Sequence, residues 1–336
     1  MKSCFVLVTL IVACGCSDSS KTPHPEVTEG LPDAFPGVEE LPDLPKTGDL
    51  YVSGFACHWK NKRWKHHVPN DANPITGIWT MGQTTALSGW DEVWWRKGDS
   101  WKKQNVESRL LDVWGSHENN IYSVGDSSTI LRFVGGESWL TEDAPEGIYS
   151  GVWGRDSEEV YAVGVGIDDS RSLIVSSKGD GKWIIEETPT ESLLHDVYGN
   201  SRDVFAVGED GVILRKTSKG GWLQEKIDTD EDFMGVWSNE HGDTYAVTSR
   251  SVFYSKGDGH WERIHKSSIQ LWAVHGLDRT VWVGGSQGVL MLLQGKDWID
   301  CSGDENLHVE TIFVSKTDDI WIGGSFYFYA EEPENR

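Results

Sequence analysis

The chain has 336 residues, and its 53 acidic residues outnumber its 30 basic residues, which gives a formal net charge of −23. A field of this sign repels the phosphates of DNA and RNA, so we expect no nucleic-acid partner. The length would allow two domains. A repeat that runs through most of the chain instead favours one domain built from stacked units.

Residues 1–16 contain a lysine, an apolar stretch and small residues with cysteine. The apolar stretch is short for a bilayer span, so it predicts an export signal peptide and not a transmembrane helix. Its end, Ile11-Val12-Ala13-Cys14, resembles the lipobox of bacterial lipoproteins, which implies an acyl chain such as palmitate on Cys14. Cys16 is the alternative lipidation site, and an ordinary secretory signal is the competing interpretation. Neither cysteine is followed by Asp, and the resemblance to lipoproteins therefore favours the outer membrane. The sequence leaves open whether the protein lies on the periplasmic face or on the cell surface.

Residues 17–47 hold six of the 11 prolines and show no sustained apolar periodicity, so they predict a flexible tether. Residues 331–336 are expected to form a short C-terminal tail. Since the acidic surface also repels anionic lipid head groups, we expect the lipid anchor alone to hold the protein at the cell envelope.

A repeated unit fills residues 48–330. Asp112-Val113-Trp114-Gly115 is followed by Ile121-Tyr122-Ser123-Val124-Gly125, and Gly151-Val152-Trp153-Gly154 by Val160-Tyr161-Ala162-Val163-Gly164. Turn signals divide each unit into four short strands, A to D from the presumed axis outward. A repeat of about 40 residues with four strands is typical of β-propellers, so the predicted fold is all-β, a single propeller.

Two sets of aromatic residues mark the repeat. Strand D of each unit opens on a tryptophan, at spacings of 37 to 44 residues: Trp64, Trp101, Trp139, Trp183, Trp222, Trp261 and Trp298. Strand A carries a bulky residue at one register: Trp79, Trp114, Trp153, Tyr198, Trp237, His275 and Phe313. Because neighbouring strand residues point to opposite faces, we expect this second set to pack between blades, with His275 a packed residue and not a ligand.

The number of blades is open between seven and eight four-stranded units. We expect three strands in residues 50–68, without an A strand, and three in residues 308–330, without a D strand. Residues 39–44 stand where the missing first A strand would lie, and an inner edge strand tolerates their proline. We therefore favour eight blades.

Two further cysteines, Cys57 and Cys301, lie near the first and last units. Export would permit a disulfide bond between them, which would fasten the closed ring. Two unpaired buried cysteines are the equal alternative.

The units resemble the BNR, Asp-box and photosystem II assembly factor propellers across residues 48–330. The resemblance rests on Val207-Gly208-Glu209-Asp210-Gly211-Val212-Ile213-Leu214 followed by Gly220-Gly221-Trp222. The turns Ser177–Trp183 and Lys256–Trp261 are degenerate Asp boxes, which implies a fold far more than a function. The arginines match no sialidase register, so we predict no catalytic residues and no enzyme activity. We also predict no cofactor and no metal site.

The local excess of aromatic residues in the first two units is the candidate binding edge. It comprises Trp59, Trp90, Trp94, Trp95 and Arg96. Trp and Arg are favoured in binding hot spots, although packing between blades would explain the same cluster. We predict a non-catalytic envelope lipoprotein whose propeller binds a protein partner. The alternative is a carbohydrate-binding or sialidase-like propeller with a glycan as its partner.

Overall fold

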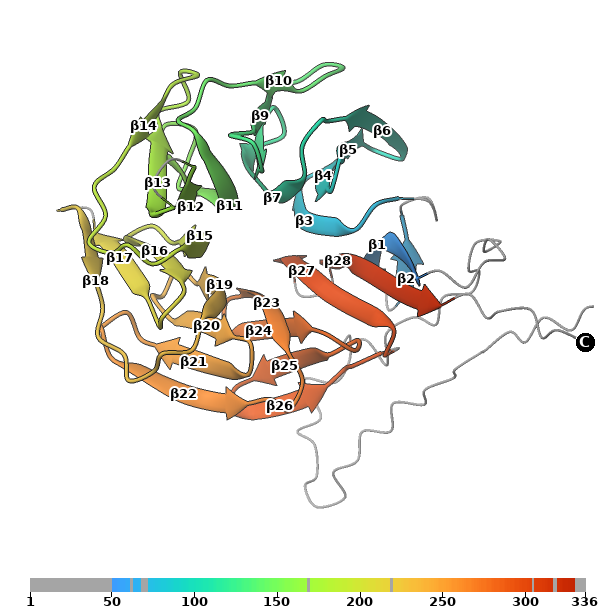
Figure 1. Cartoon of the computed structure of the whole chain (residues 1–336). Coiled ribbons are helices and arrows are strands. Elements are labelled where there is room, and N and C mark those ends of the chain that lie inside the picture. Colours follow the sequence, from blue (N-terminus) through green and yellow to red (C-terminus); the bar gives the residue numbers. More distant parts are fainter. Residues whose placement is uncertain are drawn as a thin grey trace, which may run out of the picture.

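The computed structural model describes residues 50–60, 63–67, 72–167, 170–217, 220–303, 305–316 and 319–329. These residues form 28 strands in seven four-stranded antiparallel sheets, arranged as blades of a ring around a central axis (Figure 1). The predicted all-β propeller is therefore confirmed. Among the described residues, no helix is long and apolar enough to cross a membrane.

Six blades follow the chain in order, from the innermost strand outward. Blade 1 is β3 (Ile75–Met81), β4 (Thr84–Gly89), β5 (Glu92–Lys97) and β6 (Ser100–Asn105). Blade 2 is β7 (Leu110–His117), β8 (Asn120–Gly125), β9 (Ile130–Phe133) and β10 (Leu140–Thr141). Blade 3 is β11 (Gly147–Gly154), β12 (Val160–Gly166), β13 (Ser172–Ser177) and β14 (Trp183–Ile185).

The remaining consecutive blades repeat this order. Blade 4 is β15 (Leu194–Gly199), β16 (Asp203–Gly208), β17 (Ile213–Thr217) and β18 (Trp222–Gln224). Blade 5 is β19 (Phe233–Ser238), β20 (Thr244–Thr248), β21 (Ser251–Ser255) and β22 (Trp261–Lys266). Blade 6 is β23 (Leu271–Leu277), β24 (Thr280–Gly285), β25 (Leu290–Gln294) and β26 (Asp297–Asp300).

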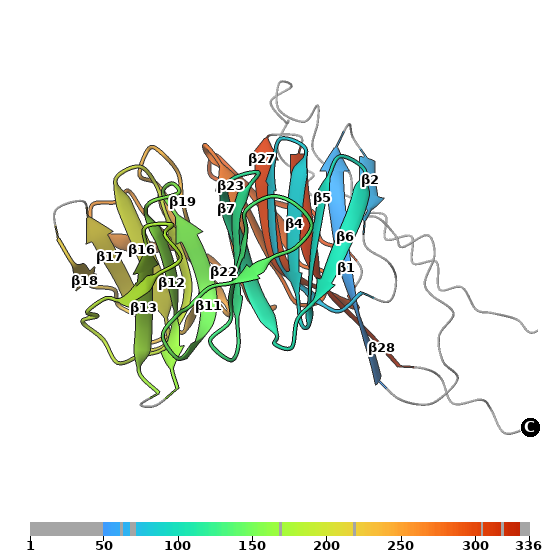
Figure 2. The same cartoon turned by 90° about the horizontal axis from the view of Figure 1, so that it is seen from above.

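Blade 7 closes the ring with strands from both ends of the chain. Its order is β27 (Leu307–Lys316), β28 (Asp319–Tyr329), β1 (Leu50–Lys60) and β2 (Arg63–His66). The long pair β1–β28 runs from Leu50 opposite Tyr329 to Trp59 opposite Ile320, and both strands extend past the ring in the side view (Figure 2). This pairing hides edges that would otherwise invite aggregation.

Our preference for eight blades is wrong, because the described strands make seven. Each terminal segment forms two strands where we expected three, since β1 and β28 are unbroken strands of 11 residues. The segments complement each other as two halves of one blade. The proposed A strand at residues 39–44 lies outside the described residues, as do the signal peptide, Cys14, Cys16, the whole tether and the C-terminal tail.

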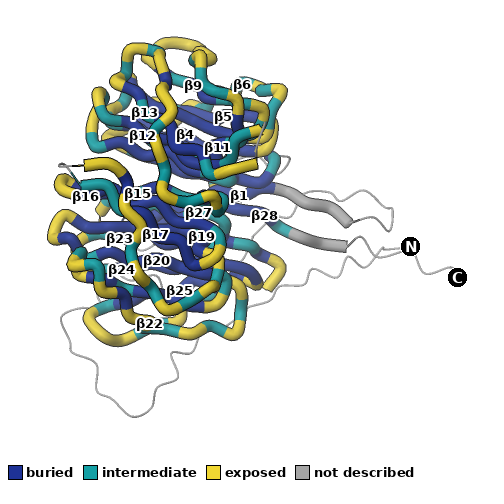
Figure 3. The backbone as a smooth tube through the Cα atoms, turned by 60° about the vertical axis from the view of Figure 1, so that its left-hand side comes forward, coloured by how far each residue is buried: buried dark blue, intermediate teal, exposed yellow. Residues whose placement is uncertain are grey.

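The core lies between the blades, where both faces of every inner strand are covered. Buried residues therefore concentrate within the strands, and exposed residues at the turns (Figure 3). The aromatic set on strand A packs blade to blade, as expected: the Trp153 ring lies 6.5 Å from Trp114 and 5.8 Å from Tyr198. We call this set the aromatic belt.

Three of the tryptophans that open strand D join neighbouring blades through a repeated hydrogen bond. The indole Nε1 groups of Trp183, Trp222 and Trp261 donate to Glu142, Glu186 and Glu225 of the preceding blade, at 2.6, 2.8 and 2.5 Å. Each glutamate also pairs with a basic side chain: Arg132, Lys216 and Arg215, respectively. The regular spacing of tryptophan in the sequence thus reflects a contact between blades.

Candidate functional site at the channel entrance

Every innermost strand contains a β-bulge at the same place. The register of each inner pair shifts by one residue between positions such as Leu110 and Asp112, or Leu194 and Asp196. The extra residues in the seven blades are Thr76, Leu111, Ser150, His195, Met234, Trp272 and Glu310. A bulge re-aims the side chain of its extra residue, and bulges are frequent at barrel rims and beside functional sites.

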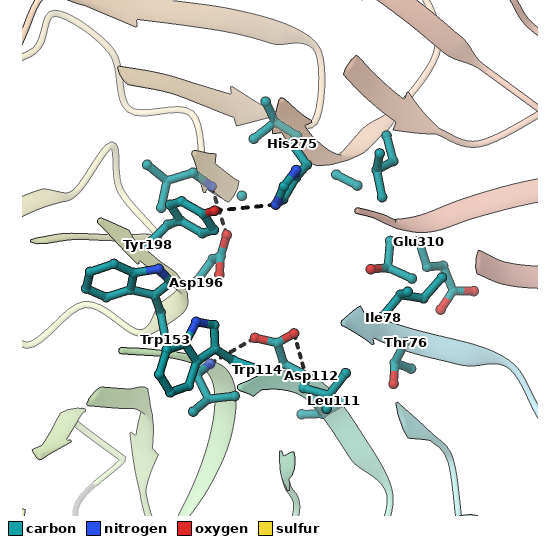
Figure 4. Close-up of a pocket in the computed structure, with 18 of the residues that line it drawn as sticks. Thr76, Ile78, Leu111, Asp112, Trp114, Trp153, Asp196, Tyr198, His275 and Glu310 are labelled. Atoms are coloured by element: carbon teal, nitrogen blue, oxygen red, sulfur yellow. Dashed lines mark hydrogen bonds between the residues drawn. The ribbon is translucent and has the colours of Figure 1, made fainter. Parts of the chain in front are cut away.

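All seven bulge side chains line one cavity on the axis, and all are half-buried. The cavity has a volume of about 260 Å³ and lies near the residues with which the innermost strands begin. Figure 4 shows Thr76, Leu111 and Glu310 around it, together with belt residues such as Trp114, Trp153 and His275. We call these residues the entrance ring. Their seven side chains are all different, whereas the strands that hold them repeat the same pattern.

Two aspartates beside the entrance ring fasten pairs of blades. Asp112 accepts hydrogen bonds from the backbone N–H of Val113, at 2.8 Å, and of Val152 in the next blade, at 2.9 Å. Asp196 repeats the arrangement with Val197, at 2.7 Å, and Val236, at 2.8 Å. Both oxygens of each carboxylate are therefore used, and the aspartates join blade 2 to blade 3 and blade 4 to blade 5.

Loss of solvent around these carboxylates disfavours their charged forms. It raises the pKa of Asp112 to about 8, helped by the nearby charge of Asp196, while the backbone N–H bonds oppose the rise. The same desolvation raises the pKa of Asp196 to about 7. Burial also raises the pKa of Glu310, against the opposing effects of Ser325 and Arg109. The channel thus concentrates acidic groups with little compensating positive charge.

His275 occupies the aromatic belt, as the sequence predicted. Its Nδ1 accepts from the backbone N–H of Val314 at 3.2 Å, and its Nε2 lies 3.4 Å from the Tyr198 hydroxyl. Burial lowers its pKa to about 3, so the ring is neutral at physiological pH. His275 is a packing residue between blades and not an ionic group of the channel.

The predicted binding edge is wrong as a surface feature. Trp59, Trp94 and Trp95 are buried in the core between blades, with 4%, 8% and 4% of their surface exposed. They belong to the interfaces on either side of blade 1 and beside blade 7, where large apolar side chains fill the space between sheets. Only Trp90, in the turn between β4 and β5, is exposed, at 40%.

Arg96 belongs to the closing interface of the ring. Its guanidinium lies 5.0 Å from the Trp101 ring and 5.1 Å from the Trp321 ring, and its Nε donates to Thr85. Burial lowers its pKa. These contacts give Arg96 a role in holding blade 1 against blade 7.

The hairpin β1–β2 also helps to close the ring, because β1 contacts β28 in blade 7. His58 is buried and its Nε2 lies 2.5 Å from Asp319 Oδ1, while Lys60 Nζ pairs with Asp319 Oδ2 at 3.2 Å. The described residues contain no group of three His, Cys, Asp or Glu side chains that could hold a metal ion. Cys57 and Cys301 are both buried in one cluster, and burial raises the pKa of the Cys57 thiol to about 12. A bond between the two sulfurs stays a prediction.

No lysine or arginine occurs among the described residues that line the cavity. Arginines that a sialidase-like site would need are engaged elsewhere: Arg132 with Glu142, Arg155 with Glu159, and Arg215 with Asp203 and Glu225. The three convergent arginines of that alternative are thus not found at this entrance.

Sequence reasoning missed the entrance ring, although a signal for it exists. In each innermost strand, two buried apolar residues lie three positions apart, as in Leu110 and Val113 or Leu194 and Val197. Strict alternation places residues of one face at even spacing, so an odd spacing indicates an extra residue between them. Seven repeats of this odd spacing would have located the bulges.

The fold and the entrance ring define a seven-bladed β-propeller with a non-repeating rim around its channel. Among solved structures, the chain is similar to YCF48 bound to a D1 peptide, with a TM-score of 0.62 and 15% identity over 77% of this chain and 92% of that one. It is also similar to YCF48 from Cyanidioschyzon merolae, with a TM-score of 0.59 and 13% identity over 76% of this chain and 95% of that one.

A third similar structure is the WD40 β-propeller domain of Doa1, with a TM-score of 0.64 and 11% identity over 83% of this chain and 98% of that one. Identities this low establish the propeller fold alone. No protein-family model and no curated protein sequence matches the chain.

Proposed function

We propose that this protein is a non-catalytic binding module, and that the entrance ring is where a protein partner is recognised. The observation that carries the proposal is the contrast within each innermost strand. A repeated, buried framework holds seven different, half-buried side chains around one cavity. A rigid, repeated scaffold that carries a different side chain in each repeat can present a specific binding surface.

The similar structures support this proposal in general terms. YCF48 is a propeller seen with a bound D1 peptide, and the Doa1 domain belongs to the WD40 propellers. Membership of the BNR, Asp-box or photosystem II assembly factor propellers is proposed here on the turn motifs alone. Function does not follow from fold, so the site must be tested directly.

We further propose that the protein is an exported lipoprotein of the cell envelope, anchored through Cys14 or Cys16. Support comes from the lipobox resemblance and from the proline-rich residues 17–47. In this arrangement the tether would hold the propeller off the membrane while leaving its entrance ring accessible. Mass spectrometry of the mature N-terminus would test it: an acylated cysteine is expected, and a free N-terminus beyond residue 16 would contradict it.

The binding proposal is tested by isolating the tagged, full-length protein from its own envelope and identifying the bound proteins and glycans. Ser150→Trp would fill the cavity at the entrance ring, and Ser201→Trp places the same bulk at an exposed turn on the opposite face. We expect a stoichiometric protein partner that Ser150→Trp removes and Ser201→Trp retains. Recovery of glycan alone would favour the carbohydrate-binding alternative, and hydrolysis of that glycan would contradict the non-catalytic assignment.

A further inference from the structure

The two faces of the propeller differ in charge. The connections from strand D to strand A and from B to C lie on the face with the channel entrance, which we call the entrance face. Their described residues include 17 Asp or Glu and 4 Lys or Arg. The A–B and C–D connections form the opposite face, with 11 Asp or Glu and 7 Lys or Arg among their described residues. The excess negative charge thus lies mainly around the channel entrance.

Several of these acids are anchored in position. Glu231 accepts from Thr248 and pairs with Arg263, and Asp232 accepts from the backbone N–H of Asp210. Arg109, which lies near Glu310, is itself paired with Asp126 at 3.1 Å. Basic residues on the strands pair with three of the acids, Glu142, Glu186 and Glu225. Because the connections themselves hold only 4 basic residues against 17 acidic ones, an excess of negative charge remains on this face.

The cavity inside this face combines a carboxylate with apolar and aromatic surface. Glu310 Oε1 accepts from the Ser325 hydroxyl at 2.5 Å, and within the described residues its second oxygen has no hydrogen-bond partner. Leu111, Met234 and Trp272 lie on the same ring, and the Trp272 indole is stacked on His308 at 5.2 Å. Asp112 and Asp196 hold backbone N–H groups with both oxygens, whereas Glu310 keeps one oxygen that no described group occupies.

The size and chemistry of the cavity favour a ligand with a small charged group on an apolar stem. About 260 Å³ is less than the ~300 to 1,000 Å³ typical of pockets for small molecules. Lysine and arginine side chains bury an aliphatic stem while keeping a charged end, and they are attracted by carboxylates and by aromatic faces. A cavity with both kinds of surface matches a single such side chain.

We propose that the entrance face binds a basic segment of a protein partner, and that one lysine or arginine of this segment enters the channel beside Glu310. The inference rests on the proposed binding function and names the chemistry of the partner. The acidic connections attract the segment over a distance, and the pair with Glu310 fixes its register in the channel.

The test uses three fluorescent peptides and the purified full-length protein. The sequences are Gly-Ser-Leu-Arg-Leu-Arg-Leu-Ser-Gly, the same peptide with neutral citrulline in place of arginine, and the same peptide with glutamate there. Binding is followed by fluorescence anisotropy at low and high salt. We expect the arginine peptide to bind about tenfold more tightly than the citrulline peptide, because only the guanidinium carries a positive charge to pair with Glu310. Added salt should weaken this binding.

Matched variants locate the effect. Glu310→Gln keeps the shape of the side chain and its bond from Ser325, and should weaken the arginine peptide about tenfold. Glu158→Gln makes the same change at an exposed position on the opposite face and should leave binding unchanged. Equal affinity for the citrulline peptide, no effect of Glu310→Gln, or no binding tighter than about 1 mM would each overturn the inference.

Failure of the inference about a basic segment can be distinguished from failure of the proposed binding function. If Ser150→Trp still removes the envelope partner while the charge of Glu310 has no effect on peptide binding, the entrance ring is a binding site for a partner of other chemistry. If neither variant changes binding, both proposals fail. Melting temperatures of Glu310→Gln and Ser150→Trp, measured in parallel, show whether each variant is folded.

Discussion

The aromatic belt and the entrance ring lie three residues apart on the same strands, yet they differ in composition. Four belt residues are buried, whereas Trp114, Tyr198 and Phe313 are half-buried like the ring. Six of the seven belt positions are aromatic and the seventh is the neutral ring of His275, and the belt packs blade against blade. The entrance ring has a threonine, a leucine, a serine, a histidine, a methionine, a tryptophan and a glutamate, all half-buried around the cavity.

This contrast separates what the fold requires from what it permits. Each belt residue fills the same space between twisted sheets, so only large side chains satisfy the packing. Each entrance-ring residue is the extra residue of a bulge and lies outside the regular hydrogen-bond ladder of its sheet. The requirements of a ligand can therefore determine which side chain stands there. Substitutions in the belt should therefore affect stability, and substitutions in the ring should affect binding.

The largest effect is expected from truncating tryptophan in the belt. Trp153→Ala removes a buried ring that contacts Trp114 and Tyr198, and should lower the free energy of unfolding by about 3–5 kcal/mol. Trp272→Ala makes the same truncation in the entrance ring, where the side chain is half-buried, and should cost less than half as much. Urea unfolding measures both. Equal losses would remove the distinction between belt and ring.

The next effect concerns the aspartates that fasten neighbouring blades. Asp196→Ala leaves the backbone N–H groups of Val197 and Val236 without their acceptor, and should cost about 2–3 kcal/mol. Asp196→Asn retains one acceptor oxygen and should have an intermediate effect. The melting temperatures of the two variants are compared by thermal unfolding. A wild-type melting temperature for the alanine variant would show that Asp196 is not needed to join blades 4 and 5.

A smaller effect is expected at the outer ends of the blades. Trp222→Phe removes the indole donor to Glu186 and should cost about 1 kcal/mol more than Trp139→Phe. Within the described residues, the indole nitrogen of Trp139 has no hydrogen-bond partner, so that variant controls for the change in ring size. The difference between the two urea midpoints measures the bond alone, and no difference would contradict its contribution.

The aspartates also predict how stability depends on pH. Folding raises the pKa of Asp112 to about 8 and of Asp196 to about 7, from the ordinary value of 3.8, so the folded protein binds more protons than the unfolded chain between these pH values. The free energy of unfolding should therefore fall steadily as pH rises from 5 to 8. Urea midpoints test this. The double variant Asp112→Asn, Asp196→Asn should lose most of the slope, and a midpoint that rises with pH would contradict the assignment.

The smallest effect on stability is expected in the entrance ring itself. Met234→Gln exchanges two flexible side chains of similar length at a half-buried position, and should change the free energy of unfolding by about 0.5 kcal/mol or less. The same variant should reduce capture of the envelope partner. A large loss of stability with unchanged capture would assign Met234 to the framework.

Residues that repeat with the unit were predictable from the sequence, and residues that break the repeat were not. The belt and the strand-D tryptophans recur because the same space between blades recurs, so the fold could be inferred from Trp114, Trp153 and their equivalents. The blade number was missed because β1 and β28 come from opposite ends of the chain, and the contact between them leaves no trace in local spacing. Trp94 and Trp95 suggested a surface because composition does not report which face of a strand is covered.

Site-specific photo-crosslinking in the native envelope would show whether the partner contacts the entrance ring. A benzophenone amino acid would replace Leu111 in the ring, or Ile184, which is 61% exposed on the outer strand of blade 3. We predict a discrete protein adduct from position 111 that is absent from position 184. An adduct from position 184 alone, or identical products from both positions, would contradict the claim.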